Sequence, residues 1–343
     1  MRDVFRLTIG TVCLWASFWA PSAFGSEHQR SLHYRQNFYD VKFQGDRAWV
    51  VGYYGTILRS KDRGLTWEVI KSGTKRPLFR VRFVDSEKGW VAGAHGEIFH
   101  TRDGGKSWAK QQSGTNEHLL GMHFLDERAG WVVGARGTIL STDNGGASWV
   151  QRSLKEDVIL NDVYFDDSRR GWIVGEFGVI YHTRDGGQLW VKEKSPVEVS
   201  PLSGVSSNLF RLLFTGPDRI WAFGLDGVAL KNQPGTGWKI AHKDGVTPDA
   251  VTNHHLFGAA YVNGRTWAVG ERGVVIISDA EKENWRAVNL GAPPLSLNAI
   301  AFAQDGVGLI VGDRGLIFRT GDGGKNWRPV KLGSDELPGA KVP

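Results

Sequence analysis

The sequence predicts an all-β protein, a seven-bladed β-propeller built from four-stranded antiparallel blades. One seven-residue phrase, Trp-x-x-Gly-x-x-Gly, recurs along the 343 residues. Its copies begin at Trp49, Trp90, Trp131, Trp172, Trp221, Trp267 and, with Leu in place of Trp, Leu309. The successive steps between these positions are therefore 41, 41, 41, 49, 46 and 42 residues. This is the period of one propeller blade, and no segment between the copies has a sustained helical pattern.

Each unit is expected to contain four short strands. The predicted first strands are Tyr39–Phe43, Phe79–Phe83, Leu120–Phe124, Asn161–Phe165, Phe210–Phe214, Phe257–Tyr261 and Asn298–Phe302. The Trp-x-x-Gly segment forms the second strand, a third follows the second glycine (as at Thr56–Arg59, Glu97–His100 and Val179–His182), and a second Trp opens the fourth. Because glycine supplies the positive φ of tight turns, Gly-x-x-Gly is expected to join strands two and three as a hairpin.

The first Trp of each phrase is expected to bury its ring between neighbouring sheets, so that Trp→Ala there costs roughly 3–5 kcal/mol. The Trp and the glycines thus belong to the scaffold. The two residues between the glycines differ at every copy and are expected to be free of scaffold duties.

The turn before the second Trp is a further repeated motif. It reads Thr101-Arg-Asp103-Gly-Gly105-Lys-Ser107-Trp108 and recurs at Ser60–Trp67, Thr183–Trp190 and Thr320–Trp327. Ser141–Trp149 reads as the same turn with one extra residue, and Lys231–Trp238 and Ser278–Trp285 are degraded copies. The motif resembles the Asp-box, or bacterial neuraminidase repeat. In such a turn the Asp and Ser/Thr side chains bind backbone groups, and the Trp fixes the turn to the sheet.

Residues 1–25 are predicted to be a secretory signal peptide, with Arg2 and Arg6 before the apolar run Leu7–Ala20 and a small-residue cleavage site at Ala23–Gly25. Residues 26–335 then form one propeller domain, and 336–343 form a C-terminal tail. Cys13 is the only cysteine, so the processed chain has no disulfide. We expect a periplasmic or secreted protein, or one of the thylakoid lumen if the host is photosynthetic. The net charge of +6 is modest and interspersed, which does not indicate nucleic-acid binding.

The residues inside the Gly-x-x-Gly turns form the first candidate site. If the first strand of each blade is innermost, these turns surround one mouth of the channel. The candidate partner-binding residues there are Tyr53, Tyr54, His95, Arg136, Phe177, Arg272 and Arg314. Arginines bind carboxylates, and aromatic side chains often dominate protein interfaces. The alternative is that these turn residues are polar only because they are solvated.

The innermost strands provide the second candidate set. Their polar positions include Asp40, Lys42, Arg80, Arg82, His123, Asp162, Tyr164 and Arg211, whereas the last two blades carry Gly258, Ala260, Ala299 and Ala301. Arg80, Arg82 and Arg211 are candidate partner-binding residues that line the channel. Pairing across blades as buried ions is an equally good interpretation. Two long connections, Lys194–Asn208 and Ala241–His255, are further places for function.

No catalytic residue, metal or cofactor is predicted. The chain lacks paired carboxylates beside a cleft, a nucleophile elbow, a phosphate loop and a Cys/His metal pattern. Asp-box propellers include sialidases, but the sialidase Arg-Ile-Pro signature is absent, since Arg219-Ile220 is followed by Trp221. Sialidases are also usually six-bladed.

The period, the starts Gly89-Trp90, Gly130-Trp131 and Gly171-Trp172, and the Thr-x-Asp-Gly-Gly-x-x-Trp turns resemble the photosystem II stability/assembly factor family with its non-photosynthetic bacterial relatives. The resemblance implies a non-catalytic lumenal or periplasmic propeller that binds a protein partner. That partner would be a membrane protein complex during assembly, or a transporter. The alternative is a glycan-active Asp-box protein, either a sialidase-like glycoside hydrolase or a lectin.

Overall fold

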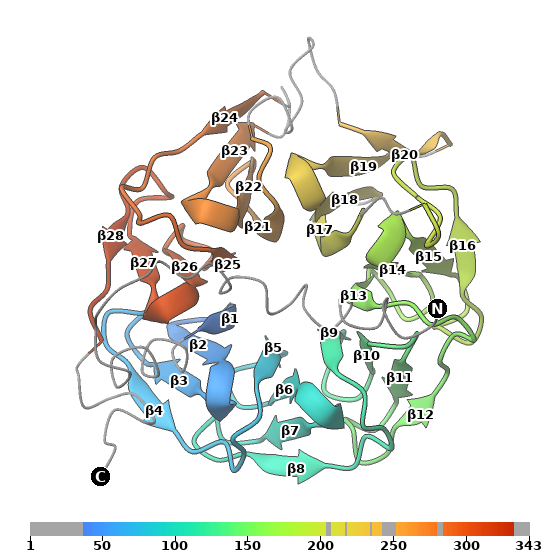
Figure 1. Cartoon of the computed structure of the whole chain (residues 1–343). Coiled ribbons are helices and arrows are strands. Elements are labelled where there is room, and N and C mark those ends of the chain that lie inside the picture. Colours follow the sequence, from blue (N-terminus) through green and yellow to red (C-terminus); the bar gives the residue numbers. More distant parts are fainter. Residues whose placement is uncertain are drawn as a thin grey trace, which may run out of the picture.

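The computed structural model describes residues 37–203, 207–216, 218–233, 235–241, 252–279 and 284–332. It contains seven four-stranded antiparallel sheets arranged in a ring (Figure 1), which confirms the predicted propeller. The predicted signal peptide, residues 1–25, and the tail, residues 336–343, lie outside the described residues. No helix in the described ranges is long and apolar enough to span a membrane.

The strands of each blade follow one another in the sequence, so blade 1 is β1–β4 and blade 7 is β25–β28. The first strands are β1 Phe38–Gln44, β5 Leu78–Phe83, β9 Leu119–Phe124, β13 Leu160–Phe165, β17 Leu209–Gly216, β21 Leu256–Val262 and β25 Leu297–Phe302. The second strands are β2 Arg47–Gly52, β6 Gly89–Gly93, β10 Gly130–Gly134, β14 Gly171–Gly175, β18 Arg219–Gly224, β22 Arg265–Gly270 and β26 Gly308–Gly312. The third strands are β3 Ile57–Ser60, β7 Ile98–Thr101, β11 Ile139–Thr142, β15 Ile180–Thr183, β19 Ala229–Gln233, β23 Val275–Asp279 and β27 Ile317–Thr320. The fourth strands are β4 Glu68–Ile70, β8 Ala109–Gln111, β12 Val150–Gln151, β16 Val191–Glu193, β20 Gly237–Ile240, β24 Trp285–Ala287 and β28 Arg328–Pro329.

The first strand of every blade is the innermost, as the sequence argument assumed. β1 contacts the first strands of both neighbouring blades, β5 and β25, and the same holds around the ring (Figure 1). Each blade therefore runs outward from the axis, and its Gly-x-x-Gly turn joins the second and third strands. Third strands begin one residue later than predicted, because Thr56 and its equivalents still belong to the turn: the Thr56 N–H donates to Tyr53 O at 3.1 Å.

The repeated Trp joins each blade to the next. The ring of Trp49 stacks on Phe83 at the end of β5, with centroids 3.6 Å apart, and Trp131 stacks on Phe165 in the same way. The Trp49 indole N–H also donates to Gly104 O in the Asp-box turn of the next blade. Trp49 is fully buried, so the predicted burial between sheets is confirmed.

Within the described ranges each sheet consists of four consecutive strands, so the ring closes by packing and not by exchange of a strand. Apolar residues of blade 1, including Phe38 and Val41, share one core with Leu309 and Val311 of blade 7. At the inner edge of the same junction, the Asn298 side-chain amide donates to Phe38 O at 2.8 Å.

The Asp-box turns have the expected hydrogen bonds. Asp103 Oδ1 accepts the N–H groups of Lys106 and Ser107 at 2.9 and 3.0 Å, and Thr101 Oγ1 accepts that of Gly105. Slight burial raises the pKa of Asp103, but the hydrogen bonds from Ser107 and Thr101 outweigh it and lower this pKa to about 2. The carboxylate is therefore ionised and fully used by its own turn.

The expected extra residue in the third turn was wrong. The turn begins at Thr142 and not at Ser141, and Asn144 takes the place of the Asp. Asn144 Oδ1 accepts the Ser148 N–H at 3.0 Å, and Thr142 Oγ1 accepts the Gly146 N–H at 2.8 Å. An amide oxygen accepts the same backbone bonds as a carboxylate oxygen, so the turn keeps its length.

Candidate functional site

The Gly-x-x-Gly turns join the second and third strands of each blade, and together they surround the centre of the ring (Figure 1). We call them the turn ring. The second residue between the glycines has a left-handed backbone in all seven blades, with φ between 53° and 59°. These residues are Tyr54, His95, Arg136, Phe177, Asp226, Arg272 and Arg314. Non-glycine residues seldom adopt this conformation, so the same strained position recurs seven times.

In four of the seven blades the first residue of the pair is buried, whereas Tyr53, Ala135 and Glu271 are half-buried. Ala94, Glu176, Leu225 and Asp313 are buried, and Asp313 accepts a hydrogen bond from the Asn298 side chain at 3.0 Å. The expectation that both residues of every pair are free of scaffold duties was therefore wrong. In these four blades the first residue packs into the blade, and in all seven blades the second residue has a positive φ.

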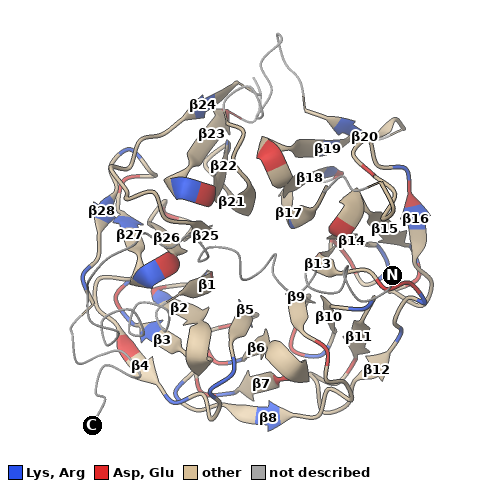
Figure 2. Ribbon diagram, in the orientation of Figure 1, with Lys and Arg blue, Asp and Glu red and all other residues tan. Residues whose placement is uncertain are grey.

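The predicted ring residues differ in exposure. His95, Arg136, Arg272 and Arg314 are exposed, whereas Tyr53, Tyr54 and Phe177 are half-buried. Figure 2 shows adjacent acidic and basic residues in the turns of blades 6 and 7, which are Glu271 with Arg272 and Asp313 with Arg314. The Arg136 guanidinium lies 3.4 Å from the Glu117 carboxylate, and such an exposed ion pair contributes little to stability.

Sequence reasoning missed the residues that support the turn ring from the next blade. In several blades the second turn residue, which has the left-handed backbone, donates its N–H to a side chain of the next blade. In these blades the acceptor is the residue directly before the first strand of that next blade. Asn208 Oδ1 accepts the Phe177 N–H at 3.1 Å, and His118 Nδ1 accepts that of His95 at 3.2 Å. Asn37 does the same for Arg314 across the closing junction. The signal was an Asn or His directly before four of the seven first strands.

The channel contains a group of charged residues from several blades, which we call the axial cluster. It comprises Lys42, Arg80, Arg82 and Arg211 with the carboxylates of Asp40 and Asp162. Their contacts cross the axis: Arg211 of blade 5 lies 3.7 Å from Asp40 of blade 1. Three of the predicted site residues, Arg80, Arg82 and Arg211, are thus brought together, and they are separate from the exposed arginines of the turn ring.

Asp40 is the centre of the cluster and is fully buried. Its Oδ2 accepts the Val81 N–H at 3.1 Å and an Arg82 N–H at 2.8 Å. Burial raises the pKa of Asp40, but the positive charges of Arg82, Arg211 and Arg80 outweigh it, and the pKa lies below its usual value. Asp40 is therefore a fixed negative charge.

Asp162 is the second carboxylate near the Arg211 guanidinium. The Arg211 Nε atom lies 3.8 Å from Asp162 Oδ2, and the same oxygen accepts the Leu212 N–H at 3.0 Å. Burial lowers the pKa of Arg211, but Asp162 and Asp40 raise it by more. Arg211 and Arg82 are therefore compensated, as the ion-pair interpretation predicted.

Arg80 and Lys42 are not compensated. Arg80 donates only to the carbonyl oxygens of Phe79 and Asn161, at 3.1 and 3.4 Å, and its buried Nε has no acceptor among the described residues. Burial is the main cause that lowers the pKa of Arg80, and the charge of Arg211 lowers it further. For Lys42, burial is again the main cause and the charge of Arg82 the next, and together they lower its pKa to about 8.

The cluster therefore has four cations against two carboxylates, an excess of two positive charges, within the described residues. His123 adds no charge near neutral pH, because burial and the charges of Arg82 and Lys42 lower its pKa to about 3. Taking cations out of water is costly unless an anion accompanies them. A carboxylate entering the channel would supply the missing charge.

The other side of the channel is different in character. Blades 6 and 7 place Gly258, Ala260, Ala299 and Ala301 on their first strands, and all four are buried or half-buried. These small side chains carry no charge, and a side chain added at Gly258 would meet Ala299 Cα at 2.8 Å, so the two strands pack closely here. No group of three or more His, Cys, Asp or Glu in the described ranges is arranged to hold a metal ion.

The fold and this cluster define a class of protein, a closed seven-bladed propeller with an unbalanced basic group on its axis. A family model described as "Photosynthesis system II assembly factor YCF48" matches residues 25–115, 110–198 and 160–233. The chain therefore belongs to the YCF48 family.

Solved structures agree with this assignment. "YCF48 bound to D1 peptide" is similar at 20% identity and a TM-score of 0.66, covering 83% of this chain and 91% of that one. YCF48 from Cyanidioschyzon merolae is similar at 18% identity and a TM-score of 0.66, covering 83% and 95%. A GH74 xyloglucanase from Xanthomonas campestris reaches a TM-score of 0.65 at 12% identity, covering 85% of this chain and 54% of that one. At these identities the likeness shows the fold alone. No curated protein sequence matches the chain.

Proposed function

We propose that this protein is a secreted or periplasmic, non-catalytic binding protein that serves as an assembly or accessory factor for a membrane protein complex. A segment of the partner lies over the turn ring, and an acidic group of that segment enters the channel. The observation that carries this proposal is the excess of two positive charges in the axial cluster.

Membership of the YCF48 family supports a protein partner, because the family model is that of an assembly factor. A similar structure contains a bound D1 peptide, which suggests that this propeller can also receive a peptide. The partner of this chain need not be the same peptide, since the two proteins are 20% identical.

The state of the channel carboxylates supports a non-catalytic role. Asp40 and Asp162 each accept a backbone N–H and contact an arginine, so neither is available as a general acid or base. A glycan-active role rests only on the common fold with enzymes such as the xyloglucanase.

The test is photo-crosslinking in the membrane fraction of the source organism. A photoreactive amino acid replaces His95, which is exposed at the turn ring. We expect one membrane protein to be crosslinked and then identified by mass spectrometry. Adding Arg80→Gln should abolish that crosslink, whereas the control Arg102→Gln, which removes an exposed arginine from an outer turn, should leave it unchanged.

Two results would contradict the proposal. One is a crosslink that persists in the Arg80→Gln variant, and the other is turnover of a fluorogenic glycoside that disappears when a single carboxylate is replaced.

A further inference from the structure

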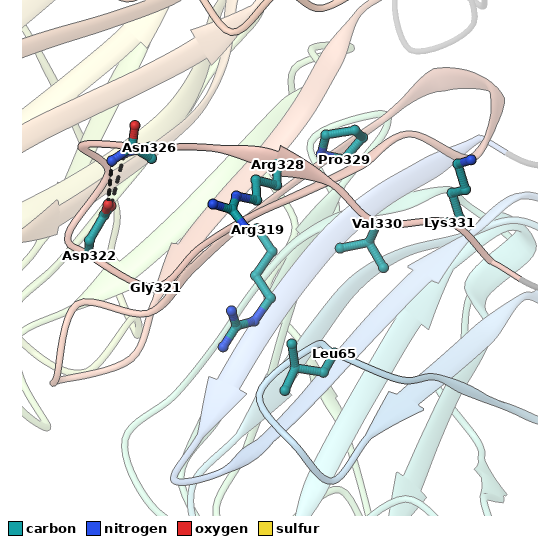
Figure 3. Close-up of a pocket in the computed structure, with 9 residues that line it drawn as sticks. All are labelled: Leu65, Arg319, Gly321, Asp322, Asn326, Arg328, Pro329, Val330 and Lys331. Carbon is teal, nitrogen blue, oxygen red and sulfur yellow. Dashed lines mark hydrogen bonds between the residues drawn. The ribbon is translucent and has the colours of Figure 1, made fainter.

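The junction between blades 7 and 1 contains a hollow of about 540 Å3 at the outer part of the ring (Figure 3). Blade 7 contributes Arg319 on β27, Arg328 on β28 and Val330 after it, and blade 1 contributes Leu65 from its Asp-box turn. This hollow is separate from the axial cluster, because it involves third and fourth strands and not the innermost ones.

The neighbouring junction, between blades 1 and 2, gives a direct comparison. Arg59 of β3 is paired in register with Glu68 of β4, and their side chains form an ion pair at 2.5 Å. Arg59 also reaches the next blade, where its guanidinium donates to Gly104 O at 3.2 Å. The arginine at this junction therefore has both a backbone acceptor and a carboxylate.

Arg319 occupies the equivalent position in blade 7 but has no such carboxylate. Its Nε donates to Arg63 O in the Asp-box turn of blade 1, at 2.8 Å. Its cross-strand partner, however, is Arg328, where blade 1 has Glu68. Like charges directly opposite one another are unfavourable. Neither arginine has an ion-pair partner in the described part of the chain.

Among the described residues that line the hollow, Asp322 is the one acidic residue, and its carboxylate already accepts hydrogen bonds. Its carboxylate accepts hydrogen bonds from Thr320 Oγ1 at 2.7 Å and from the Asn326 backbone and side-chain N–H groups at 2.9 and 2.8 Å. These bonds, led by those of Asn326, lower the pKa of Asp322 to about 2. Figure 3 shows Asp322 and Asn326 bonded to each other at one end of the hollow.

Apolar side chains also line the hollow. Leu65 is 60% exposed, and Val330 and Pro329 lie on the other blade, beside Lys331. In Figure 3 the Arg319 guanidinium extends from β27 toward Leu65. A ligand in this hollow would meet two guanidinium groups and an apolar surface together.

We propose that the hollow binds the carboxylate of an acidic residue next to an apolar one in a peptide segment, so that the ligand supplies the group that Glu68 supplies in blade 1. Arginine binds a carboxylate through parallel hydrogen bonds, and the apolar neighbour covers Leu65. A free small carboxylate with an alkyl chain offers the same chemistry.

The test uses the whole protein and a blocked pentapeptide, Gly-Leu-Glu-Val-Gly, with the Gln version as its control. Binding is followed by calorimetry and by NMR shifts of the Leu65 and Gly321 amides. We expect the Glu peptide to bind with shifts at both amides, and the Gln peptide to bind at least about tenfold more weakly, because a charge-assisted bond is lost. Hexanoate is the second arm. Equal shifts with hexanoate assign the site to free carboxylates, and shifts with the peptide alone assign it to peptides.

Arg328→Glu places the carboxylate within the chain and should abolish binding while leaving the protein folded, with a higher Tm. Lys325→Glu is the matched control, because it makes the same charge change at an exposed residue of the turn before β28 that does not line the hollow. The inference is overturned if Arg328→Glu binds the peptide as the native protein does, if Lys325→Glu loses binding equally, or if the amides do not shift. Lys42→Met, which changes the axial cluster, should leave this binding unaltered.

Discussion

The turn ring and the axial cluster both contain arginines, but the two sets differ in what the fold requires of them. Arg136, Arg272 and Arg314 are exposed and keep their water, so their charge has little effect on stability. Arg80, Arg82 and Arg211 lose their water in the channel, where two carboxylates cannot balance four cations. We therefore expect that the exposed charges can be changed with little effect on the fold, whereas a change to an axial charge should affect both the stability and the proposed binding.

Asp40→Asn should have the largest effect on the free energy of unfolding. It removes a buried negative charge and leaves Arg82 and Arg211 without that partner, which typically costs about 3–5 kcal/mol. Chemical denaturation measures the loss. Asp226→Asn, the same change at an exposed ring residue, should shift stability by no more than about 0.5 kcal/mol. Equal effects of the two variants would remove the distinction between the regions.

Lys42→Met should change the free energy of unfolding in the opposite direction, by stabilising the protein, and by a smaller amount. The pKa of Lys42 is lowered to about 8, so the unfolded chain binds more protons than the folded chain between about pH 8 and its usual value near 10.5. Native stability therefore rises with pH across this window, and below pH 8 the buried charge is a constant penalty. The variant should be more stable at pH 7, by at most about 3 kcal/mol.

Denaturation of both proteins from pH 7 to 10.5 tests this prediction, because the difference between their stabilities isolates the contribution of Lys42 from that of the other groups. We expect the difference to shrink as pH rises. A difference that is constant with pH, or a less stable variant, would mean that the Lys42 ammonium is already compensated.

Arg136→Glu combined with Arg314→Glu should have the smallest effect on the fold. Both side chains are exposed, so the free energy of unfolding should stay within about 0.5 kcal/mol per substitution of the native value. Capture of the crosslinked partner should nevertheless be lost, because the ring would repel an acidic segment. Unchanged capture would remove the turn ring from the site, and a large loss of stability would show that the ring is part of the scaffold.

The repeat made the blades predictable, because Trp, Gly and the Asp-box turn each meet a local requirement that recurs every 41 to 49 residues. The left-handed backbone of Arg136 and its equivalents was not predictable from residue type, since arginine and phenylalanine are unusual there. Support of that position by Asn208 or His118 depends on the next blade, so only the fold reveals it.

The axial residues were predictable as a set but not in their pairing. The repeat places Arg80 and Arg82 on the innermost strand of blade 2, but the sequence gives no distance from either residue to a residue of another blade. Contacts across the axis, such as Arg211 with Asp40, distinguish the compensated arginines from Arg80 and Lys42. The ion-pair interpretation thus describes Arg82 and Arg211, and partner binding by the axial arginines stays a prediction.

The most direct test of axial binding is the affinity of the crosslinked partner segment for the native protein and for Lys42→Met at pH 7. We predict that the variant is more stable and binds at least about tenfold more weakly, since a buried charge that costs stability is the one that receives the anion. A variant that is more stable and binds the segment with native affinity would contradict axial recognition of an acidic group.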